Sequence, residues 1–227
     1  MSQIFVPTTG PANWQALLAD PVRHWRTGYS ARSVAYAWEE AAGLPPEIAA
    51  LLASHEHFSQ ETPELLAAFP EWKVPLPGGS RESQNDVFAL VRTGATTLAV
   101  AVEGKVSEPF GPTVSDWLSS PSAGKIARLR FLCDLLGLAE SEVADLRYQL
   151  LHRAASAVVE RRRFGMDAAA MLVHSFSQAD EWLADFASFS GRFGGGAELG
   201  VLAGAVLPSG DRLYLGWARG DSSFLER

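Results

Sequence analysis

The chain has 227 residues, of which 47% are hydrophobic, and it carries a formal net charge of −7. This composition supplies one substantial core, so we expect a single elaborated domain over residues 1–227. The acidic balance argues against non-specific binding to nucleic acid, which basic side chains drive by neutralising phosphate. No run of 18 apolar residues and no basic-then-apolar start occurs, so we expect a cytoplasmic protein that does not act at a membrane.

The first part of the chain, residues 1–70, is predicted to be a helical extension. Asn13, Ser30 and Pro46 each stand where a helix cap or a first helical residue is expected. Gly43 is a natural stop for the second of these helices. The predicted helices cover Trp14–Leu18, Ala31–Ala42, Glu47–Ala53 and Pro63–Ala68.

Residues 71–176 are predicted to form the core of the fold. Glu71–Leu76 resembles an edge strand, because prolines and glycines follow it closely. Asp86–Arg92 and Thr97–Val106 are rich in β-branched and other apolar residues, and a short turn containing Gly94 separates them. These two segments are therefore predicted to pair as a hairpin.

The rest of the chain alternates helical and strand patterns. Apolar spacing, caps and glycine stops mark the helices, and the buried strand is marked by a continuous apolar run. Residues 177–227 are predicted to add a helix and a second hairpin. The fold class is thus α/β (α+β), with a mixed central sheet flanked by helices. The expected helices are Ser115–Leu118, Lys125–Leu136, Ser141–Arg163 and Asp180–Phe189, and the expected strands are Met166–Phe176, Leu199–Leu207 and Leu213–Trp217.

Charged residues interrupt the first predicted hairpin. Asp86 begins one strand, while Glu103 and Lys105 end the next and lie on the same face, because side chains alternate along a strand. Buried charges are costly unless they are paired or bind a metal. One interpretation is a site in which Asp86 and Glu103 bind Mg²⁺ or Mn²⁺ and Lys105 orients or activates the nucleophile. The other is a salt-bridged hairpin.

Further candidates lie around this hairpin. Glu82 and Glu108 are second-rank acids near its two ends. Gln149 and Arg153 share one polar stripe of the long predicted helix, where they either face solvent or reach the metal-bound water or a phosphate.

A local basic surface is also predicted, because residues 121–165 hold eight Lys or Arg against five Asp or Glu. Lys125 and Arg128 in this segment are candidates for contacts with a nucleic-acid backbone.

These residues resemble the PD-(D/E)XK, or restriction-endonuclease-like, superfamily of phosphodiesterases over about Glu71–Phe176. Asp86 matches its strand acid, Glu103-x-Lys105 its signature, and Gln149 its helical polar residue. The proline of the superfamily's name is absent, since Asn85 precedes Asp86. The resemblance implies a nuclease that uses Mg²⁺ or Mn²⁺ and acts on DNA or RNA, in a class of enzymes that often form homodimers.

Longer phrases such as VAVEGKVSEPFGPTVSDWL and LRYQLLHRAAS resemble a family of uncharacterised bacterial proteins over the whole chain. This second resemblance implies no substrate. A catalytically inactive member that uses the nuclease-like fold to bind protein or nucleic acid remains the alternative function.

Overall fold

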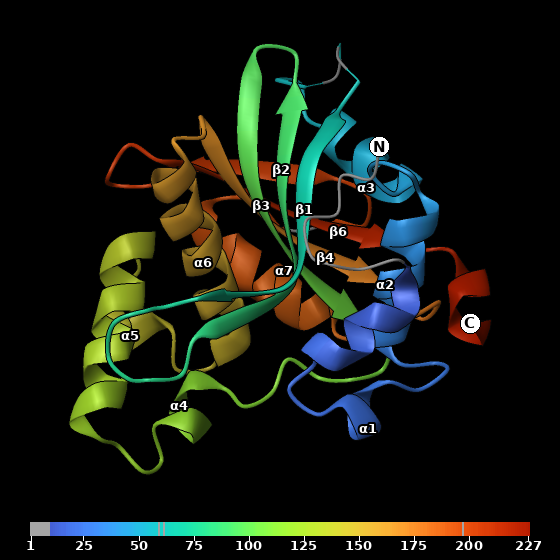
Figure 1. The fold of residues 1–227 in the computed structure, drawn as a ribbon. Coiled ribbons are helices and arrows are strands. Elements are labelled where there is room, and N and C mark those ends of the chain that lie inside the picture. The colour runs from blue at the N-terminus through green and yellow to red at the C-terminus, as the bar shows by residue number, and fades with distance from the viewer. Residues whose placement is uncertain (1–9, 59, 61, 197) are drawn as a thin grey trace.

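The computed structural model describes residues 10–58, 60, 62–196 and 198–227. Its centre is a six-stranded sheet in the order β1-β2-β3-β4-β6-β5, with helices on both faces (Figure 1). This confirms the expected mixed sheet flanked by helices. The strands are β1 (Glu64–Val74), β2 (Ser83–Thr93), β3 (Thr96–Lys105), β4 (Ala168–Ser175), β5 (Leu202–Val206) and β6 (Arg212–Arg219).

The first three strands form an antiparallel meander, and β3 then pairs in parallel with β4. Parallel neighbours need a long crossover, and here it contains α5 and α6. The second hairpin adds β6 in parallel to β4 and leaves β5 at the edge. The helices are α1 (Pro21–His24), α2 (Ser30–Glu40), α3 (Pro46–Ala53), α4 (Val114–Trp117), α5 (Ala123–Leu136), α6 (Tyr148–Phe164) and α7 (Leu183–Ser190).

The sheet separates two apolar cores, because alternate residues of its strands point to opposite faces. On β3, Ala101 belongs to the core beneath α5, α6 and α7. Its neighbours Val100 and Val102 belong to the core beneath α2 and α3. Figure 1 shows these two groups of helices on opposite sides of the sheet. The cysteine, Cys133, is buried in the first core, and burial raises the pKa of its thiol to about 11.

Three predicted helices are wrong in type or extent. The predicted helix Trp14–Leu18 is a 3-10 helix that covers Pro11–Leu17. The segment Pro63–Ala68 is not a helix, because Glu64 begins the long strand β1. Its Leu and Ala residues favour a helix locally, but the ladder with β2 and the burial of Leu65 and Ala68 outweigh that preference. The long helix begins at Tyr148 rather than at Ser141.

Where the long helix was expected to begin, the chain instead forms a short 3-10 helix at Glu140–Glu142. Beyond it, Arg147 forms an isolated bridge to Thr113 in extended conformation, so the chain enters α6 only afterwards. Other 3-10 helices cover Pro11–Leu17, Gly191–Phe193 and Ser222–Glu226.

In the part of the chain that is described, no helix is both long and apolar enough to cross a membrane. The start of the chain, for which we expect no targeting signal, lies mostly outside the described residues, because the description begins at residue 10.

At Gly104, α2 packs closely on β3. A Cβ atom placed there would lie 2.5 Å from Val34 Cγ2 and 3.2 Å from Asp86 Oδ2. We therefore expect Gly104→Ala to lower the free energy of unfolding by about 1–3 kcal/mol, because the added methyl overpacks this contact. Urea denaturation measures the change. Gly191→Ala is the control, since its Cβ would meet nothing within 4 Å; equal losses in both variants would contradict the close packing at Gly104.

Candidate active site

Three carboxylates from neighbouring strands line one cavity. The pairs Pro70–Val87 and Trp72–Asn85 bracket Glu71 and Asp86, so these two acids lie at the same level of the sheet. Glu103 follows Val102, whose partner is Val87, and so continues the same row onto β3. The cavity that they share has a volume of about 460 Å³. The register of the meander therefore brings the acids together.

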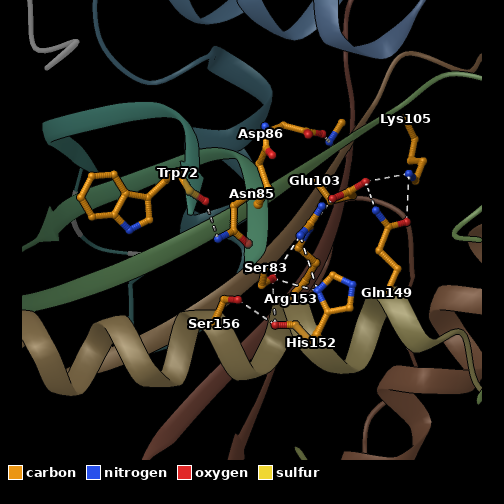
Figure 2. A network of polar contacts seen from close by, with 12 residues as sticks. Trp72, Ser83, Asn85, Asp86, Glu103, Lys105, Gln149, His152, Arg153 and Ser156 are labelled. Atoms are coloured by element: carbon orange, nitrogen blue, oxygen red, sulfur yellow. Dashed lines mark hydrogen bonds and ion pairs between the residues drawn. The ribbon is translucent and has the colours of Figure 1, made fainter. Parts of the chain in front are cut away.

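Glu103 is the most strongly paired of the three acids. Its Oε1 accepts hydrogen bonds from Lys105 Nζ and Gln149 Nε2, each at 2.7 Å, and its Oε2 accepts one from Arg153 Nε at 2.5 Å (Figure 2). Glu103 and Lys105 are only 3% and 4% exposed. Burial by itself would raise the pKa of Glu103, but Arg153 and Lys105 outweigh it and lower the pKa to about 2. Glu103 is therefore ionised at neutral pH.

The other two acids have the opposite electrostatics. Burial, with the charges of Glu103 and Glu71, raises the pKa of Asp86 well above its ordinary value. Asp86 Oδ2 accepts a 2.6 Å hydrogen bond from the Gly104 backbone N–H. Burial also raises the pKa of Glu71 to about 7, although Gln84 donates a hydrogen bond to it. The four carboxyl groups that line the cavity, those of Glu71, Asp86, Glu103 and Glu108, outnumber its arginines, Arg23 and Arg153. This excess favours binding of a proton or a cation.

The helix α6 supplies the polar groups that face this row. Gln149 and Arg153 are four residues apart and so lie on one side of the helix. Arg153 Nη1 also donates to Ser83 Oγ at 3.1 Å, and Ser83 Oγ lies 2.8 Å from His152 Nδ1. Burial and the charge of Arg153 hold the pKa of His152 well below its ordinary value, so this imidazole is neutral at pH 7. Figure 2 shows Gln149 and Arg153 reaching Glu103 from the helix, while His152 points to Ser83 of β2.

The second-rank acids occupy different places. Glu108 lines the acid cavity, but its oxygens accept hydrogen bonds from Ser30 and from the Val106 backbone N–H, which tie the end of β3 to α2. Glu82 is exposed and lines two adjoining cavities rather than the acid cavity. The roles predicted for these two acids stay predictions.

Lys125 and Arg128 lie away from the acids, at a neighbouring cavity. Arg128 is 5% exposed and donates to the backbone carbonyls of Leu76, Pro77 and Arg81, so it holds that loop in place. Lys125 Nζ donates to the carbonyls of Trp117 and Ser120. Contact of these two residues with a nucleic-acid backbone stays a prediction.

Glu71 was not among the candidate residues. The sequence did contain a hint: Glu71 is an acid in the predicted edge strand, and antiparallel pairing of that strand with the next can place Glu71 opposite Asp86. Only the register shows this, and Glu71 also adopts a φ of 53°, which is unusual for a residue other than glycine. Strained backbone of this kind is found preferentially at functional sites.

The donor set suits a hard divalent cation in type, since Asp86 and Glu103 offer carboxylate oxygens. The carboxyl groups of Glu71 and Asp86, when ionised, would also compensate the positive charge of such an ion. Within the described residues, however, no three His, Cys, Asp or Glu side chains are grouped so as to hold a metal ion. Glu103 already accepts three hydrogen bonds, so Oε2, which has a single donor, is the oxygen with room left for an ion.

The raised pKa of Glu71 makes stability depend on pH. Between its ordinary value of 4.5 and about 7, the folded protein binds more protons than the unfolded chain, so the free energy of unfolding falls as the pH rises. Glu71→Gln carries no such proton. Between pH of about 4 and about 8, we expect this variant to gain up to about 3 kcal/mol relative to the wild type.

Urea denaturation of both proteins across this pH range measures the difference. The exposed Glu142→Gln is the matched control and should follow the wild type at every pH. A Glu71→Gln variant that also follows the wild type would show that this carboxyl titrates normally.

Comparison with known proteins gives a family but no activity. The model of the family described as "Domain of unknown function (DUF6946)" matches residues 7–222. No curated protein and no solved structure matches the chain significantly. Nothing in these comparisons connects the chain to the PD-(D/E)XK superfamily, whereas a family that spans the whole chain agrees with the resemblance of its longer phrases. The chain belongs to the DUF6946 family, whose domain covers nearly its entire length.

Proposed function

We propose that this protein is a nuclease that uses Mg²⁺ or Mn²⁺ to hydrolyse phosphodiester bonds in nucleic acid. The observation that carries the proposal is the row of Glu71, Asp86 and Glu103 in one cavity, together with the buried Lys105 that pairs with Glu103. Burial and mutual repulsion raise the pKa values of Glu71 and Asp86, which is the electrostatic setting expected of a site built for a cation.

In this proposal Asp86 and Glu103 hold the ion, and Glu71 adds negative charge next to them. A bound divalent cation would polarise the phosphodiester and lower the pKa of water. Lys105 orients the attacking water, because its ammonium already lies 2.7 Å from Glu103 and 3.4 Å from Gln149. Gln149 positions both groups. The resemblance to PD-(D/E)XK enzymes supports this assignment of roles, since a polar residue on the helix after the hairpin often assists there.

The second candidate function is a catalytically inactive, nuclease-like module that binds protein or nucleic acid. The pairing of Glu103 favours it, because Lys105, Gln149 and Arg153 together occupy both carboxylate oxygens. Removing one partner from such a buried network leaves an uncompensated charge, so the network also has structural value. The two functions differ in whether a metal ion binds at Asp86.

Isothermal titration of Mn²⁺ and Mg²⁺, combined with cleavage of labelled single- and double-stranded DNA and RNA, tests the proposal. We expect the wild type to bind the ion and to cleave at least one of these substrates. Asp86→Asn should lose ion binding and reduce cleavage by about 100-fold or more, since one electrostatic group at a reacting centre contributes about this much.

The matched control is Asp134→Asn, which changes an exposed aspartate on α5 outside the cavity. It should bind the ion and cleave as the wild type does. A folded wild type that neither binds the ion nor cleaves any of the four substrates would contradict the nuclease proposal and favour the binding module.

A further inference from the structure

The acid cavity continues into two more cavities along α6. A second cavity, of about 450 Å³, shares Gln84, Gln149 and Arg153 with it. A third, of about 620 Å³, shares Glu82, Pro112, Tyr148 and His152 with the second. The second cavity therefore adjoins each of the other two, and we call this series of three cavities, which leads away from the acids, the groove. We call its far end the aromatic end, defined by Arg81, Trp117, Lys125, Arg128, Tyr148 and His152.

The aromatic end differs in chemistry from the acid cavity. The rings of Trp117 and Tyr148 stack with their centroids 4.0 Å apart and an interplanar angle of 9°, and both residues are partly exposed. Lys125 Nζ lies 5.4 Å from the Trp117 ring centroid. Three basic residues line this end against one acid, Glu82. This end is therefore locally basic, whereas the whole chain carries a net charge of −7.

Aromatic rings next to basic side chains are the means by which proteins hold unpaired nucleic acid. The rings contact base faces, which are exposed only in a single strand, while the cations attract the backbone. A duplex covers its base faces and is bound mainly through many phosphate contacts. An acidic chain with only a few basic side chains in one groove is poorly suited to binding a duplex in this way.

We propose that the groove binds an unpaired strand of DNA or RNA, with a base against the exposed part of the stacked Trp117–Tyr148 pair and phosphates near Arg81. This inference rests on the proposed nuclease function, because it places the strand with one end in the acid cavity. It assigns the substrate class, a single strand or a single-stranded end. Gln149, Tyr148 and His152 line the path between the two ends.

Binding is measured without cleavage, by fluorescence anisotropy of labelled oligonucleotides of about ten nucleotides in EDTA. We expect the full chain to bind single strands more tightly than a duplex of the same sequence. Trp117→Leu should weaken binding of the single strand by about tenfold, within the range that base–aromatic contacts contribute. Trp117→Phe, which keeps a ring, should restore most of the affinity and shows that lost folding is not the cause.

Matched controls exist for both the ring and the charge. Trp182→Leu removes another partly buried tryptophan, which packs on the same core and also has a cation near its ring, but lies outside the groove. Arg81→Gln should lower the salt dependence of binding by about one phosphate contact, whereas Arg130→Gln, on an exposed part of α5, should not.

The outcomes separate this inference from the nuclease proposal. Tighter binding of the duplex, no binding of any strand, or equal losses in Trp117→Leu and Trp182→Leu would overturn the assignment of the groove. Cleavage that persists with any of these results would leave the nuclease proposal standing. Single-strand binding that Asp86→Asn retains but Trp117→Leu loses would support the groove independently of catalysis.

Discussion

The buried pairing of Glu103 with the polar side chains of α6 is the interaction on which the rest of the site depends. Glu103 lies at the end of β3, and Arg153 on α6 meets it across the interface between sheet and helix. Taking these charges out of water is costly, and their mutual attraction offsets that cost only when the geometry is good. The pairing, together with the apolar packing of α6 on the sheet, therefore fixes where the N-terminal half of α6 lies.

From that position several other features follow. Gln149 reaches Glu103 and Lys105 because it lies one turn before Arg153 on the same face of α6. Tyr148, at the first turn of the helix, stacks on Trp117 of α4 and so forms the wall of the groove. At the other side of Glu103, the close approach of Gly104 to Val34 lets α2 cover the cavity. One ion-paired acid thus connects the acid cavity, the helix and the aromatic end.

The same acid sets the electrostatics of its neighbours. Arg153 and Lys105 are committed mainly to Glu103, so the carboxyls of Asp86 and Glu71 are buried beside a negative charge with less compensation. Their raised pKa values are the consequence, and a cation or a proton would relieve the repulsion. Arrangements of this type are frequent where a protein binds a metal or transfers a proton, which is why the nuclease proposal is preferred to a purely structural hairpin.

The sequence by itself determined the fold class, the first hairpin and the convergence of Glu103 and Lys105, because alternation along a strand and turn residues are local properties. It also identified Gln149 and Arg153 as one stripe of a helix. It failed at Pro63–Ala68, where pairing with β2 outweighs helix propensity. Only the tertiary structure decided that Glu71 stands beside Asp86, that Arg128 holds a loop, and that Trp117 meets Tyr148. These facts depend on strand register and on packing between distant segments, which residue type and spacing do not encode.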